Sequence, residues 1–409
     1  MLGRRQLTMR RRATGSSTAA IGLGAVACAL VACDVYDAGL LDDDDVDAPD
    51  LCCSTMPETG VDQGPPAGDL GTDAGAPPDT GPPVDDSGCA LRHPPVRPVG
   101  EDGPGDEVFW WVVTSVNLGS GGMWATVGYD LDNRCTTIDS TDLECAPQPG
   151  FTPPNDGVEG VDNTFGQSFL ALIDLFVPDW EQAVNEGFRD GRASILARLT
   201  GWNGELDDPV VDFALVATLP FPDGDPPPRF DGTDEYIVNL RGFAAGDVNR
   251  PLARDSNAYI ADGVLVARPR DGSEIVLSGA RAVVPVRLNG IILTGHIDPE
   301  ARFVSGTLAG RWPIDAIFDG FVRAGICPGT ETHTAAQTGL ARAADLTPDG
   351  MPTPFMSCEA MSVGFNFMGV RVIVARYEMG PPDMSACDDA GVEEDSGSSG
   401  SADAGMDAD

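Results

Sequence analysis

The sequence contains no lysine: all 25 basic residues are arginine, against 64 aspartate and glutamate residues. Without lysine the chain cannot build a phosphate-binding P-loop or form a Schiff base with a carbonyl substrate. The formal net charge of −39 repels nucleic acid and anionic lipid surfaces. We therefore expect no nucleic-acid partner.

Histidine is scarce as well, since only His93, His296 and His333 occur. The chain has neither the G-x-S-x-G segment of many serine hydrolases nor the H-E-x-x-H helix of zinc proteases. Three scattered histidines do not indicate a zinc site either. We assign no catalytic residue from the sequence; whether the chain is an enzyme stays open, and a non-enzyme is favoured.

The first 32 residues predict an export signal. Five arginines lie between positions 4 and 12, and residues 16–32 are uncharged, mainly apolar and too few to span a membrane comfortably. The sequence Leu30-Val31-Ala32-Cys33 resembles the lipobox of bacterial lipoproteins. This resemblance implies cleavage before Cys33 and attachment of several acyl chains there, which anchors a protein stably. An ordinary cleaved signal or an uncleaved anchor is the alternative.

Eight of the ten cysteines remain once Cys28 leaves with the signal and Cys33 carries lipid. An even number in an oxidising compartment predicts disulfides. Spacing favours a Cys135–Cys145 bond and a Cys327–Cys358 bond. The pairing of four others is left open, namely Cys52, Cys53, Cys89 and Cys387. A structural zinc site is the alternative, but no C-x-x-C motif occurs.

Composition divides the mature chain into three parts. Residues 33–104 are rich in Asp, Pro and Gly and poor in large apolar side chains, which predicts a lipid-anchored disordered tether. Residues 105–384 form a folded head, and residues 385–409 form a second acidic disordered tail. The predicted location is the cell envelope, with the outer membrane favoured and the head facing the periplasm or the exterior.

Short β-branched and aromatic runs separated by turn residues dominate the head. They predict a mainly β fold, an antiparallel sandwich or barrel with about three short packing helices. The helices are expected at 165–176, 179–188 and 313–325. The expected strands are 108–117, 123–130, 193–201, 210–218, 235–241, 257–268, 274–278, 282–288, 291–297, 302–310 and 361–378.

The clearest local prediction is a hairpin at Asn289-Gly290. Asn-Gly between two apolar runs supplies the positive φ angles of a type I′ turn. Such a turn would place four apolar side chains on one face, namely Val286, Leu288, Ile291 and Leu293. Pro285 has no amide donor, so its strand is expected at an edge or at a bulge.

Beyond the lipobox and tether, several short segments follow in a distinctive order. They are Val161-Asp162-Asn163, Trp202-Asn203-Gly204 with Asp207-Asp208, the run from Gly306 to Trp312, and the run from Cys358 to Ser362. In this order the chain resembles uncharacterised secreted lipoproteins of myxobacterial type. The resemblance implies topology and location but carries no activity.

The first candidate binding site is the acidic loop after residue 201. An aromatic platform with adjacent acids suits a saccharide, because the ring stacks on the sugar and the carboxylates accept hydroxyl protons. The alternative is a solvated loop with the tryptophan packed beneath it. The residues assigned to the site are Trp202, Asn203, Glu205, Asp207, Asp208 and Asp212.

The second candidate is a structural Ca²⁺ site on a Gly-rich loop, formed by Asp156, Glu159, Asp162 and Asn163. Ca²⁺ binds six to eight oxygens of such side chains and carbonyls. The spacing is not that of an EF-hand, and Asn163 would in any case suit a helix N-cap. The pair Asp130 and Asp132 also lacks EF-hand continuation. No other cofactor is expected.

Two functions are compatible with these features. The first and favoured one is a non-enzymatic surface module that binds a glycan or envelope protein, or serves a structural role. The second is an extracellular glycan hydrolase with paired carboxylates. The membrane is a partner through the N-terminal lipid, and the sequence leaves the oligomeric state open.

The lipobox yields a direct test. Cys33→Ser removes the acylated thiol, so the protein should move from the detergent-soluble membrane fraction to the aqueous phase. A variant that stays membrane-bound would show that Cys33 is not the anchor.

Overall fold

The structure is a computed structural model that describes residues 89–100, 103, 105–174, 178–192, 194–222, 224–278, 283–298, 300, 302–381 and 387. The predicted export signal, Cys33, Cys52 and Cys53 lie outside these residues. So do most of the predicted tether and the tail apart from Cys387.

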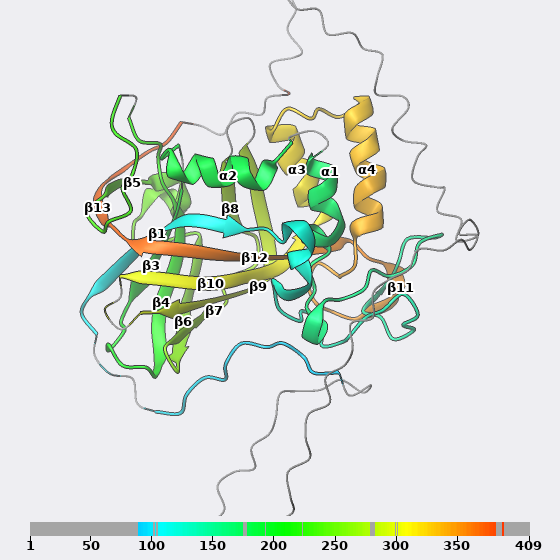
Figure 1. The fold of residues 1–409 in the computed structure, drawn as a ribbon, viewed down its shortest axis with the longest axis horizontal. Helices are drawn as coiled ribbons and strands as arrows, with labels where there is room; N and C mark the ends of the chain where they lie inside the picture. Colours follow the sequence, from blue (N-terminus) through cyan, green and yellow to red (C-terminus); the bar gives the residue numbers. More distant parts are fainter. Residues whose placement is uncertain are drawn as a thin grey trace, which may run out of the picture. The chain divides into compact units, whose positions relative to one another are not determined.

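The head is a closed antiparallel barrel of eight strands, which confirms the mainly β prediction and selects a barrel over a sandwich (Figure 1). Pairing of β10 with β9 closes the sheet. A further strand, β8 (Ser273–Ser278), pairs with the N-terminal part of β9, residues 283–288. In sheet order the barrel strands are β10 (Phe303–Pro313), β12 (Ala360–Arg371), β1 (Val108–Asn117), β3 (Ile195–Thr200), β4 (Asp208–Ala217), β6 (Ala253–Ala261), β7 (Val264–Ala267) and β9 (Val283–Ile297).

Side chains fill the barrel. Alternate residues of β12 point inward, as period-two patterning requires, and these are Met361, Val363, Phe365 and Phe367. The interior retains an apolar cavity of only about 30 Å³. Pockets for drug-sized ligands measure roughly 300–1,000 Å³, so this barrel is a packed core.

Helices gather on one side of the barrel (Figure 1). A π-helical turn at Phe165–Phe169 continues into α1 (Leu170–Asp174), and α2 (Trp180–Arg189) packs on β1. The π-helical turn with α1, the helix α2 and the helix α3 (Ile314–Arg323) agree with the three predicted helices. In the described residues no helix combines the length and apolar character that a membrane span needs.

A fourth helix, α4 (Glu331–Ala343), was not predicted. Its sequence is rich in Thr and Ala, so it shows little apolar periodicity. The side chain of Thr330 caps its N-terminus by accepting the backbone N–H of His333.

Two small parallel ladders lie outside the barrel. In one, β2 (Cys145–Ala146) pairs with β11 (Thr353–Ser357). In the other, β5 (Glu235–Asn239) pairs with β13 (Ile373–Glu378).

The predicted hairpin at Asn289-Gly290 is wrong, because β9 runs through it as one strand. Gly290 has a φ of +54°, and the register with β10 slips at this point. A bulge therefore replaces the turn. The extra residue shifts the alternation by one, so that Val286, Leu288, Ile291 and Leu293 still all face the core.

A two-residue turn does occur at Asp262-Gly263, inside the predicted strand 257–268. Both residues have positive φ, +53° and +75°, and Ala261 pairs with Val264 across them. These are the angles of a type I′ turn, which splits the segment into β6 and β7.

The predicted strand 123–130 is also wrong. Residues Ser120–Thr126 form 3₁₀ turns, and Gly119, Gly121 and Gly122 all have positive φ. Glycine supplies such angles without the strain that a side chain would meet, so the chain curls here instead of extending.

The cysteines predicted to form disulfides do so, but with other partners. The bonds are Cys89–Cys135, Cys145–Cys358 and Cys327–Cys387. The predicted Cys135–Cys145 and Cys327–Cys358 pairings are therefore wrong. The parallel pairing of β2 with β11 brings Cys145 beside Cys358, with 5.1 Å between their Cα atoms.

The end of the predicted tether packs against the head. Leu91 is buried, and the backbone N–H of Arg92 donates to the carbonyl of Glu159. Further along, the Arg97 guanidinium donates to the Asn257 carbonyl. The folded unit therefore includes the segment from Cys89 to Arg97.

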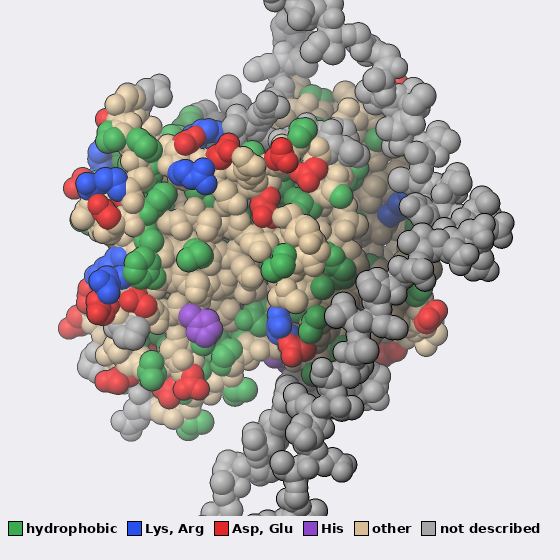
Figure 2. Space-filling view, viewed as in Figure 1, with side chains coloured by type: hydrophobic (Ala, Val, Ile, Leu, Met, Phe, Trp, Pro, Cys, Tyr) green, Lys and Arg blue, Asp and Glu red, His purple; other side chains and the backbone are tan. Residues whose placement is uncertain are grey.

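Charged side chains on the face shown in Figure 2 are mixed, with most visible arginines beside acids. Ion pairs between partly exposed side chains of the described residues include Arg371–Glu107 and Arg302–Glu300. Such pairs add little stability individually.

Barrel closure depends on Gly306, which lies opposite Gly295 in the β9–β10 ladder. A Cβ on Gly306 would lie 1.9 Å from the Thr294 carbonyl oxygen, so Gly306→Ala forces the two strands apart. We expect a loss of about 3 kcal/mol in the free energy of unfolding, at the upper end of overpacking costs. Ser305→Ala, exposed on the same strand, is the control in urea denaturation. Equal stability of the two variants would contradict this account of closure.

Candidate functional site: a buried carboxylate cluster

Carboxylates from four separate segments meet beside one end of the barrel. Asp130 and Asp132 come from the turn before Cys135, and Glu144 directly precedes β2. The loop before the π-helical turn supplies Asp156 and Asp162, and Asp345 follows α4. Asp130, Asp132, Asp162 and Glu144 are buried.

Backbone amides fix the orientation of these side chains. One oxygen of Asp130 accepts the N–H of Asp132 at 3.2 Å and that of Asn133 at 2.7 Å. Asp162 accepts the N–H of Leu131 at 2.6 Å. Asp156 accepts the N–H of Thr136. The loops are thus tied together through the carboxylates.

Glu144 has its own partner in Arg311 of β10. The guanidinium contacts both carboxylate oxygens, at 2.6 and 2.9 Å, and also donates to the carbonyls of Leu131 and Thr347. Both side chains are almost fully buried. Bidentate pairing of this kind is the geometry in which arginine binds carboxylate best.

Asp345 is also satisfied by hydrogen bonds. Its oxygens accept the backbone N–H and the hydroxyl of Ser362 on β12, at 2.7 and 2.5 Å. The Thr164 hydroxyl donates to it at 2.8 Å. Asp345 therefore links the barrel wall to the start of the helical layer.

Asp132, Asp156 and Asp162 form the inner part of the cluster. Oxygens of Asp130, Asp132 and Asp162 lie within 4.8 Å of one another. The negative charge of Asp156 adds to the effect of burial in raising the pKa of Asp162. All three inner residues line a cavity of about 20 Å³, room for an ion or water molecule.

Burial makes ionisation of this cluster unfavourable. It raises the pKa of Asp132 to about 7, with the negative charges of Asp130 and Glu144 adding to the effect. It likewise raises the pKa of Asp156 to about 8, and that of Asp162 well above its usual value. Burial also raises the pKa of Asp345 to about 6. Neighbouring carboxylates repel in a dry site, so they hold protons or require a cation.

The predicted Ca²⁺ ligands divide into two groups. Asp156 and Asp162 lie in the cluster, but Glu159 points away and pairs with Arg92 at the surface. Asn163 uses its amide to bind the Val127 and Gly364 carbonyls instead.

Sequence reasoning set aside Asp130 and Asp132 because they lack EF-hand spacing. The sequence signal was two aspartates two residues apart and followed by Asn133, residue types typical of a tight turn. In the structure Asn133 has the φ of +62° of such a turn. Their partners are distant in sequence, so spacing alone could not find them.

The Trp202 loop is built as a structural turn. Trp202 is 9 % exposed, packs on Phe109 with ring centroids 5.2 Å apart, and donates its indole N–H to the Glu205 carbonyl. Its ring is thus part of the core, and the side chain does not offer a stacking face to a sugar.

The acids of that loop are engaged as well. Asp208 is fully buried and accepts the backbone N–H of Asn203 at 2.8 Å. Asp207 accepts a backbone N–H from the β6–β7 turn, and Asp212 pairs with Arg254. Glu205 remains exposed. The loop brings these residues close together, but mainly to brace its own backbone.

The three histidines occupy separate places in the structure and make different contacts. His93 contacts Asp130 at 2.9 Å on the outer side of the carboxylate cluster. His296 is exposed on β9, and His333 is buried in the first turn of α4 against Phe318.

Comparison of the chain with protein-family models, with curated proteins and with solved structures found no match. The site is therefore interpreted from its geometry alone.

The raised pKa values predict how metal-free protein responds to pH. The folded state keeps protons on Asp132 and Asp156 that the unfolded chain, with pKa values of about 3.9, releases near pH 4. Stability should therefore fall as pH rises from about 4 to 8, by roughly 1.4 kcal/mol per pH unit for each proton difference. Urea midpoints measured in EDTA test this, and Asp156→Asn should show a shallower decline. An identical pH slope in the two proteins would contradict the assignment.

Proposed function

We propose that this chain is a lipid-anchored protein of the bacterial cell envelope, attached through Cys33. Its barrel acts as a non-enzymatic binding or structural module, and the carboxylate cluster holds a divalent cation that stabilises the head. The outer membrane is the favoured location, with the head facing the periplasm or the exterior.

The observation that carries the cation proposal is the arrangement of Asp132, Asp156 and Asp162. Three acids surround an ion-sized cavity, and each has one oxygen held by a backbone N–H. A bound cation would neutralise their repulsion and let them ionise at neutral pH.

The donor set favours Ca²⁺. The ligands are carboxylate oxygens, which suit hard cations, whereas zinc in proteins is held mainly by Cys and His. Flexible coordination at 2.3–2.6 Å lets Ca²⁺ use an irregular cage, while Mg²⁺ demands near-octahedral geometry and keeps several waters. A cavity of about 20 Å³ leaves little room for those waters.

The size of the carboxylate-lined cavity favours a non-enzymatic module over a glycan hydrolase. Its paired carboxylates have the raised pKa values of a general acid, but about 20 Å³ does not admit a sugar ring. The Trp202 loop, the other candidate, uses its aromatic ring and most of its acids for packing and bracing. Release of reducing ends from a glycan panel would contradict this part of the proposal.

Thermal unfolding at pH 8 tests the cation site. Ca²⁺ added to EDTA-treated protein should raise the stability, by about 2.7 kcal/mol at a hundred times the Kd. The increase should be smaller at pH 5, where protons compete for the same oxygens. Mg²⁺ at equal concentration should have less effect.

Asp156→Asn removes one charged ligand and should abolish most of the Ca²⁺ effect. Asp139→Asn, at an exposed acid in the same region, is the matched control and should respond like the wild type. The cation proposal fails if Ca²⁺ leaves the wild type unchanged, or if it stabilises both variants equally.

A further inference from the structure

Two surface segments carry no charge at all, in a chain with 64 acidic residues. One spans residues 145–155 and the other residues 350–358. We call them together the β11 lobe. Phe355 is 97 % exposed, and Met351 and Met356 are each 63 % exposed.

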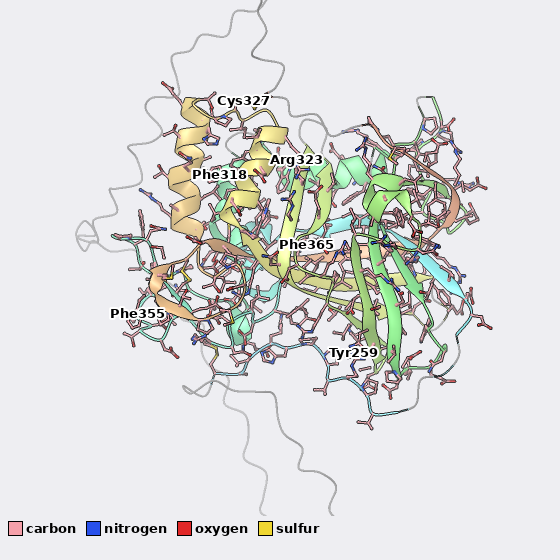
Figure 3. The ribbon with its side chains drawn as sticks, turned by 180° about the vertical axis from the view of Figure 1, so that it is seen from behind. Tyr259, Phe318, Arg323, Cys327, Phe355 and Phe365 are labelled. Carbon is pink, nitrogen blue, oxygen red and sulfur yellow. A yellow bond between two sulfur atoms is a disulfide. The ribbon has the colours of Figure 1, made fainter. Side chains whose placement is uncertain are left out.

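The β11 lobe is a braced structure. Pairing of β2 with β11 and the Cys145–Cys358 disulfide join its two segments. The N–H of Thr353 also donates to the Glu144 carbonyl at 2.6 Å. Phe355 lies at the outer edge of the molecule, beyond the helices and the barrel (Figure 3). The apolar side chains are thus presented to solvent by a fixed backbone.

Exposed apolar residues at the other end of the barrel have charged neighbours, unlike those of the β11 lobe. Phe303 begins β10 and pairs with Val370, whereas β11 directly precedes the opposite end of β12. This far end carries charged side chains, including the Arg371–Glu107 ion pair. Single apolar side chains among charges are ordinary on protein surfaces, but an uncharged apolar lobe marks an interaction site.

The point where the remaining chain joins the head indicates the partner. Cys89 begins the described residues and is bonded to Cys135, whose neighbour Thr136 lines the same small cavity as Pro153 and Cys358 of the β11 lobe. The chain toward Cys33 therefore starts beside this lobe. If the chain is anchored through Cys33 as proposed, the bilayer that holds the lipid is an apolar surface always near the head.

We propose that the β11 lobe docks on the zwitterionic surface of the bilayer that holds the Cys33 lipid. Phenylalanine and methionine side chains bury well in the headgroup boundary. Burial of one such side chain raises the affinity of the head for the bilayer by roughly tenfold. A contact of this strength alone would not hold a protein that is free in solution. Anchoring raises the effective concentration of the surface, so a weak contact suffices. Asp349 directly precedes the lobe, and Asp139 follows Ile138, whose N–H donates to Asn155 of the lobe. These acids disfavour anionic lipid.

The test places an indole at position 355 of the full-length lipidated protein, reconstituted into phosphatidylcholine vesicles with brominated acyl chains. Bromine quenches indole fluorescence only at close range. These vesicles should quench the fluorescence added by Phe355→Trp. The quenched fraction should be several-fold larger than for the fluorescence added by Phe303→Trp at the far end of the barrel. Vesicles rich in phosphatidylglycerol should give less quenching.

The outcomes separate this proposal from the anchor. Flotation of the protein with the vesicles reports on Cys33, while the difference between positions 355 and 303 reports on the lobe. Flotation with equal quenching at both positions overturns lobe docking and leaves the anchor in place. A dimer in detergent that Phe355→Asp converts to monomer assigns the lobe to a second copy of the chain, which also overturns it.

Discussion

The buried pair of Arg311 and Glu144 is the constraint on which the rest of the site depends. Arg311 belongs to the barrel strand β10, yet its guanidinium reaches carbonyls and a carboxylate on three separate loop segments. Gly290 and Gly350 flank the Arg311 side chain, at positions where a Cβ would lie in ordinary van der Waals contact with it, at 3.4 and 3.6 Å. A buried charge without its partner costs about 3–5 kcal/mol, so the loops carrying Leu131, Glu144 and Thr347 are held where the arginine can be satisfied.

With those loops fixed, Asp132 and Asp162 are held close to each other. Asp132 follows Leu131 by one residue, and Asp162 holds the N–H of Leu131. The cluster thus results from a barrel strand that positions loops, and not from a binding motif in one segment. Repulsion among these acids can be relieved by protons or by a cation, which is the basis of the proposed response of the cluster to pH and to Ca²⁺.

Sequence patterns predicted what depends on neighbouring residues and missed what depends on distant ones. Alternating apolar residues gave most barrel strands, and capping sequences gave three helices, because both signals are local. Asn289-Gly290 and Asp262-Gly263 have the same turn chemistry, but only the second lies between strands that pair with each other. Likewise Cys145 is close to Cys135 in sequence and to Cys358 in space. Asp156 and Asp162 were predicted as ligands from one loop, whereas Asp132 joins them only through tertiary packing.

The order of the three disulfides determines how the head would carry mechanical load. Tension applied between Cys89 and Cys387 passes through the Cys89–Cys135 bond, the short stretch to Cys145 and the Cys145–Cys358 bond. From Cys358 it reaches Cys387 by two covalent routes, forward along the chain or back to Cys327 and across the Cys327–Cys387 bond. The barrel strands from β1 to β10 lie within the two covalently closed loops, off this path. Pulling would therefore act on two parallel segments, one with β12 and β13 and the other with α4 and β11, while the barrel strands from β1 to β10 stay off the covalent path as long as the bonds remain oxidised.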